Sequence, residues 1–328
     1  MLKRILYSTT FLLMLLNLQV SAQNVNESPR PIEKLSNPKA SKQAKKLYKK
    51  LLKYSADKKM LSGQMWAPWG GIDEIEYVHE VTGKYPAVRG HDLIHDGSNK
   101  RELELLIEWY RKGGIPTLMW HWGAPTKGEG YEQSKMRIDV EKCFIEGTPE
   151  YHAMWQDLRR VADWLTVLRD AKVPVLWRPM HEFDGKWFWY GKGGGELFVK
   201  LWVTMYEYFT EERGLNNLIW VLCHSGELDR DYIVDRKYFD ICGPDTYSKE
   251  AQQGLYYEIE SMYGKGNMIP LHECGTLPSP EECKQNGTQW LWWMLWHTSH
   301  VQRHNKEELR RIYHHPDVIT LDELQSAK

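Results

Sequence analysis

The stretch YHAMWQDLRRVADWLTVLRDAKVPVLWRPMHE, residues 151–182, joins an amphipathic segment to a short apolar one. The second part, VPVLWRPMHE at 173–182, is an apolar run that ends on polar side chains, which is typical of a buried parallel strand. In the first part, apolar residues recur every three or four positions, and this spacing predicts a helix with one buried face. These residues are Met154, Leu158, Val161, Leu165 and Leu168.

The same alternation continues along the chain. A second helix-like segment, ELELLIEWYRKGG at 102–114, ends with glycines after a basic turn. Strand and helix repeated eight times, over a length that suits one domain, predict a (β/α)8 TIM barrel. The connection after the fifth run is short and irregular, and we expect the weakest repeat there. The eight apolar runs are 60–66, 85–93, 115–122, 173–182, 217–225, 238–247, 268–275 and 290–297.

An open, doubly wound sheet is the alternative fold. It is disfavoured because no GxGxxG motif follows an early strand. We therefore expect residues 41–328 to form a single catalytic barrel domain.

The amino-terminal 40 residues differ from the rest. Residues 1–22 have a charged start, an apolar stretch and the small residues Val20, Ser21 and Ala22, which is typical of a cleaved signal peptide. The apolar stretch is shorter than the ~20 residues that cross a bilayer, which disfavours a membrane anchor. Residues 23–40 are polar and contain three prolines, which predicts a flexible leader. We expect a secreted or periplasmic protein.

The composition limits the partners. The formal net charge of −1 gives no general attraction to nucleic acid or to a membrane surface. The lysine-rich segment 41–59 has apolar residues at helical spacing, so its lysines are expected on a solvated helix face. The five cysteines match no zinc pattern, and the sequence leaves their pairing open. We expect a monomer.

Polar side chains concentrate where the predicted strands end. In a barrel of this type the active site lies at the carboxyl ends of the strands, so these side chains are expected to share one cavity. Period-two alternation puts Arg178 and Glu182 on one face, Leu271 and Glu273 on another, and Met294 with Trp296 on a third. Two carboxylates facing one ring-lined cavity predict glycoside hydrolysis. The strand-end residues are Asp92, His121, His181, Glu182, Tyr247, Glu273 and Trp296.

The stretch RPMHEFDGKWFWYG at 178–191 resembles the acid/base signature of glycoside hydrolase family 26. The resemblance extends over nearly the whole chain after the leader. The family consists mostly of β-1,4-mannanases, with some β-1,3-xylanases and mixed-linkage glucanases. The other segments that carry it are LSGQ (61–64), WHW (120–122), EGTPE (146–150), GPDTY (243–247) and HECG (272–275).

Position by position, the resemblance implies that Glu182 is the general acid/base and Glu273 the nucleophile, with Arg178 in support. It implies that Tyr247 hydrogen-bonds the nucleophile and that His181 contacts the sugar near its 2-hydroxyl. The resemblance also implies three further substrate contacts: His121 and the stacking ring Trp296 around the attacked sugar, and Trp187 near the leaving group.

Several positions depart from the usual family pattern. Tyr190 stands where Trp is common, Phe183-Asp184 replaces a Met-Asn-like pair, and Cys274 follows the nucleophile position. We expect these residues to affect the shape of the sugar subsites. The four rings of 187–190 are expected to form a platform for a sugar chain, whose apolar surroundings raise the pKa of Glu182.

The predicted substrate is a β-mannan or a manno-oligosaccharide, cleaved with retention. The alternatives are a hydrolase of mixed-linkage β-glucan or β-1,3-xylan, and a non-catalytic sugar-binding protein on the same scaffold. The sequence does not distinguish mid-chain attack from release of mannobiose. Although there are 13 histidines, HExxH and its reverse are absent, so no metal or other cofactor is predicted.

Overall fold

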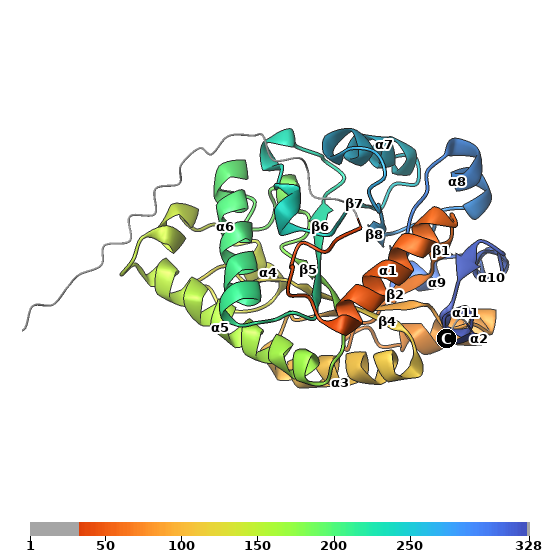
Figure 1. Cartoon of the computed structure of the whole chain (residues 1–328), viewed down its shortest axis with the longest axis horizontal. Coiled ribbons are helices and arrows are strands. Elements are labelled where there is room, and N and C mark those ends of the chain that lie inside the picture. Colours follow the sequence, from red (N-terminus) through yellow and green to blue (C-terminus); the bar gives the residue numbers. More distant parts are fainter. Residues whose placement is uncertain (1–32, 327–328) are drawn as a thin grey trace, which may run out of the picture.

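The computed structural model describes residues 33–326, and eight parallel strands of this part close into a barrel (Figure 1). The barrel closes where Gln64 pairs with Leu295. The predicted (β/α)8 barrel is confirmed, and the open sheet is wrong because the first and last strands are paired. In spatial order the strands are β2 (Gly63–Met65), β3 (Val88–Asp92), β4 (Ile115–Trp120), β5 (Val175–Pro179), β6 (Leu218–His224), β7 (Ile241–Thr246), β8 (Leu271–Cys274) and β9 (Trp293–Leu295).

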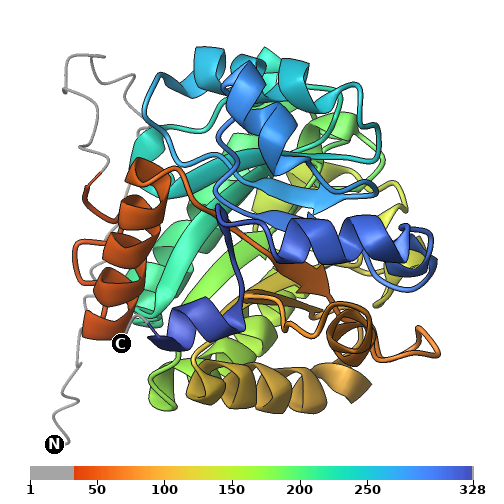
Figure 2. The ribbon, with the colours of Figure 1, turned by 90° about the vertical axis from the view of Figure 1, so that its right-hand side faces the viewer.

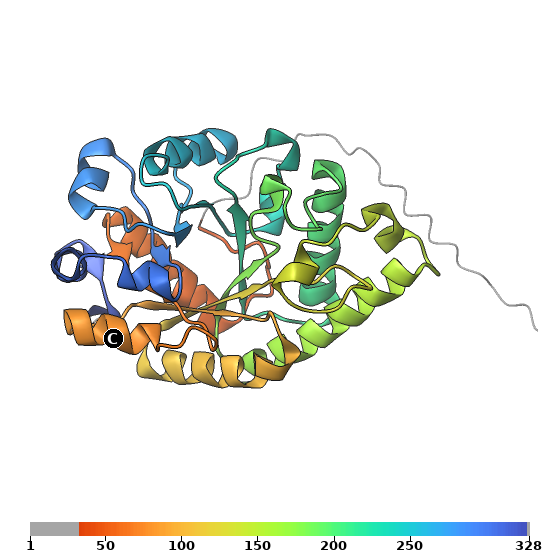
Figure 3. The same cartoon turned by 180° about the vertical axis from the view of Figure 1, so that it is seen from behind.

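Helices enclose the strands, and α3 and α5 contact each other along one flank (Figure 3). Short 3-10 helices are η1 (Val140–Phe144), η2 (Phe183–Gly185), η4 (Arg230–Tyr232) and η5 (Arg236–Tyr238), and α6 continues into a π-helical turn, η3 (Tyr208–Glu212). The α-helices are α1 (Lys42–Ala56), α2 (Glu74–Thr82), α3 (Asp96–Lys112), α4 (Tyr131–Ser134), α5 (Pro149–Asp170), α6 (Gly195–Glu207), α7 (Gln252–Tyr263), α8 (Pro280–Asn286), α9 (Ser299–Gln302), α10 (Lys306–Tyr313) and α11 (Leu321–Ser326).

The two helices predicted from apolar spacing are present. In α5 the five predicted apolar residues are buried, the Thr148 side chain caps the first turn, and Pro149 occupies the start, where no backbone N–H is needed. Helix α3 ends at Gly113, whose φ of 101° suits glycine. The irregular repeat is also where it was expected: β6 is followed by the short helices η4 and η5 before β7 begins.

Side chains of the strands alternate between two apolar cores. In β5, Leu176 belongs to the core inside the barrel, whereas Trp177 belongs to the core between the barrel and the helices. Helix α1 adds Tyr48 and Leu51 to the inner core. It lies beside β6 (Figure 2, red ribbon), and the Ser41 N–H just before it donates to the carbonyl of Asn216, at the amino-terminal end of that strand. Helix α1 therefore covers the amino-terminal end of the barrel.

A second, two-stranded parallel sheet pairs β1 (Met60–Leu61) with β10 (Val318–Ile319). It brings the carboxyl-terminal part of the chain next to the first barrel strand. The predicted apolar run 60–66 is thus divided between this small sheet and β2.

The expected alternation fails in β8. Its pairing with β9 shifts register between Leu271 and Cys274, so two successive residues lie on the inner side. His272 packs against Trp292 of the inner core, and Glu273 faces the cavity. Leu271 lies in the outer core instead. The prediction that Leu271 and Glu273 share a face is therefore wrong.

The predicted signal peptide, residues 1–22, lies outside the described residues. The predicted flexible leader, residues 23–40, falls partly within them, and its end is packed: Leu35, Asn37 and Ala40 are buried, and the Ser36 N–H donates to Asp240 Oδ1 at 2.5 Å. The packed domain thus extends back to Leu35, before the predicted boundary. All five cysteines are buried free thiols. Between residues 33 and 326, no helix combines the length and apolar character needed to cross a membrane.

Candidate active site

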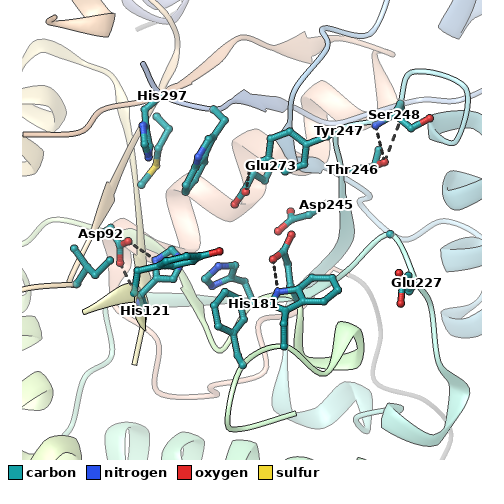
Figure 4. A pocket seen from close by; sticks show the side chains of 18 of the residues that line it. Asp92, His121, His181, Glu227, Asp245, Thr246, Tyr247, Ser248, Glu273 and His297 are labelled. Atoms are coloured by element: carbon teal, nitrogen blue, oxygen red, sulfur yellow. Dashed lines mark hydrogen bonds and ion pairs between the residues drawn. The ribbon is translucent and has the colours of Figure 1, made fainter. Parts of the chain in front are cut away.

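A cavity of about 930 Å³ lies at the carboxyl ends of the strands (Figure 4). Residues from the ends of most barrel strands line it, which is the position expected for the active site of this fold. Arg178 lies beneath it and is buried. The other seven predicted site residues all line the cavity: His121, His181, Glu182, Trp187, Tyr247, Glu273 and Trp296.

Glu182 lies three residues after β5, on a backbone that points its side chain into the cavity. Its φ of 54° is uncommon for a residue other than glycine, and its N–H donates to the carbonyl of Cys223 at 2.8 Å. The indole N–H of Trp187 donates to Glu182 Oε2 at 2.9 Å. Burial and then the nearby Glu273 charge raise the pKa of Glu182 to about 7. Glu182 can therefore carry a proton near neutral pH.

Glu273 is surrounded by donors instead. Both terminal nitrogens of Arg178 donate to Glu273 Oε2, at 3.2 and 3.1 Å. The Tyr247 hydroxyl donates to Glu273 Oε1 at 2.5 Å, and burial together with Glu273 raises the pKa of Tyr247, so the hydroxyl keeps its proton. These donors hold both oxygens of the carboxylate in place. The implied hydrogen bond from Tyr247 is thus present.

Asp245 is a member of this cluster that the sequence prediction missed. It lies in β7, two residues before Tyr247, and Arg178 forms an ion pair with it as well as with Glu273. The thiol of Cys223 lies 2.9 Å from its other oxygen. The quoted GPDTY motif contained the signal, because residues two apart on a strand lie on the same face.

The three carboxylates lie close together. Glu182, Asp245 and Glu273 each offer an oxygen within 4.8 Å of the others. Retaining glycosidases have carboxyl groups about 5–5.5 Å apart, whereas inverting ones need about 6.5–9.5 Å. The same oxygens are near enough to share a metal ion, but the Arg178 guanidinium already binds two of the three groups.

Two imidazoles form the floor beside the carboxylates. His121 follows β4, and Asp92 at the end of β3 binds it at two points. Asp92 Oδ1 accepts the backbone N–H of His121 at 3.0 Å, and Oδ2 binds ring Nδ1. Burial alone would lower the pKa of His121, but Asp92 raises it. The ring of His181 lies 4.5 Å from that of His121, and burial lowers its pKa well below the usual value. Nδ1 of this neutral ring is buried without a partner in the described structure.

The rings of 187–190 divide into two groups. Trp187 and Phe188 line the cavity, as predicted for a sugar platform. Trp189 and Tyr190 are fully buried; the Trp189 indole N–H donates to the carbonyl of Trp122 at 2.8 Å, and the Tyr190 hydroxyl donates to the carbonyl of His181 at 2.9 Å. The prediction of a four-ring platform is therefore wrong for two of them, which support the loop from behind.

The departures from the family pattern also lie behind the cavity wall. Phe183 stacks on Phe198, and Asp184 binds His224 Nδ1 at 2.5 Å and the Ser225 N–H at 2.7 Å. Cys274 faces the outer core. These residues and Tyr190 are absent from the described cavity lining, so any effect that they have on the shape of the sugar subsites is indirect. They hold the Glu182 loop and β8 in place.

Other lining residues were not predicted as site residues. Trp69 follows β2 and His297 follows β9, and their rings meet edge to face at 5.7 Å. The centre of the His95 ring lies 6.3 Å from that of the Trp69 ring. Trp296, partly exposed, continues the inward row of Trp292 and Met294, as predicted. No motif marked Trp69, because the irregular segment after β2 has no periodic pattern.

The barrel brings two carboxylates in different environments, imidazoles and aromatic rings together at the carboxyl ends of its strands. This arrangement is typical of a barrel glycoside hydrolase. Residues 36–323 match the family model "Glycosyl hydrolase family 26". The chain therefore belongs to this family, as the sequence resemblance predicted.

Named relatives and solved structures agree with this assignment. The chain is 33% identical over 326 residues to mannan endo-1,4-beta-mannosidase B of Piromyces sp, covering 93% of this chain and 56% of that protein. It spans about half the length of the curated Piromyces relatives that it matches.

Two solved structures share the fold over nearly their whole length. A β-mannanase from a symbiotic protist of the termite Reticulitermes speratus, complexed with gluco-manno-oligosaccharide, has a TM-score of 0.80 at 28% identity, over 91% of this chain and 99% of that one. GH26A from Muricauda sp. MAR_2010_75 has a TM-score of 0.81 at 32% identity, over 88% and 99%.

Proposed function

We propose that this protein is a retaining glycoside hydrolase that cleaves β-1,4-mannosidic bonds in mannans. The names of its relatives and the oligosaccharide bound to the protist enzyme support this substrate class. The observation that carries the mechanism is the contrast between two neighbouring carboxylates: Glu182 has its pKa raised to about 7, and Glu273 is held by Arg178 and Tyr247. Such a pair supplies one acid and one nucleophile.

In the first step, a Glu273 oxygen attacks the anomeric carbon while Glu182 transfers its proton to the departing glycosidic oxygen. The glycosidic bond breaks and a glycosyl-enzyme ester forms. In the second step, ionised Glu182 takes a proton from a water molecule whose oxygen attacks the same carbon and releases Glu273. Trp187 stays hydrogen-bonded to Glu182 through both roles and favours its ionised form between the steps.

The substrate is positioned by the groups around this pair. Trp296 stacks on the attacked sugar, and His121 and His181 face its hydroxyl groups. The unpartnered Nδ1 of His181 supports such a contact, because a buried polar atom is costly unless a ligand or water satisfies it. Trp187 lies on the side of the leaving group, where its indole binds the acid/base.

The sequence also supports proposals about the location and the remaining partners. The signal-like residues 1–22 support export to the cell exterior or the periplasm. We propose a monomer whose partner is a β-mannan or manno-oligosaccharide, with no nucleic acid or membrane involved.

Product analysis on a panel of polysaccharides tests this proposal. Purified protein should release reducing ends from β-mannan, and the newly formed anomer, followed by NMR, should be β as in the substrate. Cleavage of lichenan or β-1,3-xylan with mannan left intact would exclude the substrate class, and an inverted anomer would exclude the mechanism. Binding to mannan without any released ends would favour the sugar-binding alternative.

Azide rescue on an activated aryl glycoside distinguishes the roles of Glu182 and Glu273. Glu182→Ala should still form the glycosyl-enzyme, because the leaving group needs no proton, and azide should then give a β-glycosyl azide. Glu273→Ala cannot form that intermediate, so azide should give at most an α-product. The opposite pattern would exchange the two roles.

A further inference from the structure

The barrel closes at a short seam between β2 and β9. Only one register position, Gln64↔Leu295, joins these three-residue strands, whereas β3 and β4 are joined at five. The Gln64 amide reinforces the seam, since its Nε2 donates to the carbonyls of Leu295 at 3.1 Å and Trp296 at 3.3 Å. The backbone pairing between the two strands that carry these loops is thus short.

Those two loops carry one wall of the cavity. Trp69, from the β2 loop, is 49% exposed and packs edge to face on His297, from the β9 loop, beside Trp296. In Figure 4, His297 lies on the opposite side of Glu273 from Glu227 and Ser248. His297 Nδ1 is buried and has no partner among the described residues. An unsatisfied buried ring nitrogen next to two indoles suits a sugar bearing hydroxyl groups.

A fully buried carboxylate joins the two loops behind this wall. Glu74, the first residue of α2, accepts the Thr298 N–H at 2.8 Å through Oε1 and the Ala67 N–H at 3.3 Å through Oε2. Thr298 has φ 55° and ψ −125°, a conformation that a β-branched residue keeps only when its surroundings impose it. Gly70 leaves room for the contact, because a Cβ there would meet Glu74 Oε1 at 2.7 Å and Thr298 Cγ2 at 2.8 Å.

We propose that Glu74 is a positioning residue that holds the loops after β2 and β9 at the separation at which Trp69 and His297 bind the sugar beyond the attacked one, on the glycone side. This proposal rests on the proposed function for the identity of the ligand. Glu74 touches no substrate; it acts through Thr298 and Ala67. The effect should therefore fall on recognition of the second sugar and should spare the bond-breaking carboxylates.

Glu74→Gln tests the proposal with the shape of the side chain kept. The amide has one oxygen, so it can accept from only one of the two N–H groups and presents its own N–H₂ to the other. Hydrogen–deuterium exchange should rise in peptides covering 66–72 and 296–302. The matched control is Glu76→Gln on the same helix, where the carboxylate is exposed and binds Tyr85; it should leave both peptides unchanged.

The kinetic test compares 2,4-dinitrophenyl β-mannobioside with 2,4-dinitrophenyl β-mannoside. Both have an activated leaving group, and only the first places a second sugar on the glycone side. Glu74→Gln should lower kcat/KM for the bioside about tenfold, the scale of a lost stacking contact, and change the monoside little. A loss of folded protein would lower both substrates equally, so the ratio separates positioning from stability.

If Glu74→Gln does not fold, Gly70→Ala replaces it, because the added methyl group displaces the same contact. Unchanged exchange at 296–302 in a folded variant would overturn the proposal whatever the substrate. An unchanged bioside-to-monoside ratio would overturn it too. If wild-type protein cleaves neither glycoside nor mannan, the proposed function fails, while the exchange experiment still decides whether Glu74 holds the loops.

Discussion

The two ends of the barrel interior differ in what they bury. At the amino-terminal end, Leu51 of α1 belongs to one apolar cluster with Leu176 of β5. Two residues further along β5, Arg178 is 2% exposed and pairs with Asp245 and Glu273, which are 1% and 4% exposed. Burying such charges costs several kcal/mol unless they are paired. Stability and chemistry are therefore expected to reside at opposite ends of the same strands.

The largest effect should come from removing a charge at the carboxyl end. Glu273→Ala should lower kcat on mannan about 10³-fold or more, because the proposed nucleophile is lost. The free energy of unfolding in urea should fall by less than about 2 kcal/mol, since the variant also removes a buried carboxylate. A large loss of stability with activity retained would show that this end of the barrel contributes to stability and not to catalysis.

The matching change at the amino-terminal end is Leu51→Ala. A cavity in this apolar cluster should cost about 2–5 kcal/mol of unfolding free energy. At a temperature where the variant is fully folded, kcat/KM should equal the wild-type value, because Leu51 lies at the opposite end of the barrel from the cavity. A substantial loss of kcat in the folded variant would show that the two ends are coupled.

Trp296→Ala tests a residue at the boundary between the apolar core and the cavity. Trp296 is partly exposed and packs on the inner core while lining the cavity. The loss of its proposed stacking on the attacked sugar should lower catalytic efficiency about tenfold or more. An unchanged rate in a folded variant would assign the ring to the core.

The pH dependence should report the buried acid. As the proposed acid, Glu182 must be protonated to donate, and burial with the Glu273 charge raises its pKa to about 7. The kcat/KM on mannan should therefore fall as pH rises above about 7, approaching tenfold per pH unit. Trp187→Phe removes a hydrogen bond that favours ionised Glu182, so the alkaline limb should move to higher pH. If the alkaline limb of the kcat/KM profile does not move in this variant, Trp187 does not influence the pKa of Glu182.

The smallest effect is expected from chelation. The carboxylate mechanism needs no cation, and Arg178 already compensates Asp245 and Glu273. Activity should be unchanged after incubation with EDTA and gel filtration. A lasting loss that one divalent ion restores would show that the three carboxylates bind a metal.

Much of the fold was predictable because it depends on local spacing. The period of apolar residues in α5 and the polar ends of the strands are properties of short segments, and eight repeats of strand and helix suit a barrel. The bulge in β8 was not predictable, because it arises from the pairing of β8 with β9. It places Glu273 in the cavity although Leu271 faces outward.

The barrel, the two glutamates at strand ends and the family could all be predicted from the sequence, since each depends on neighbouring residues or a continuous motif. The pairing of buried groups depends instead on the folded chain: Asp245 meets Arg178, Glu74 meets Thr298, and α1 lies across the amino-terminal end of the barrel. These contacts join residues far apart in the chain, and their geometry depends on strand register and loop path. A buried carboxylate needs a hydrogen-bond donor, but the sequence around the carboxylate does not show which distant residue supplies that donor.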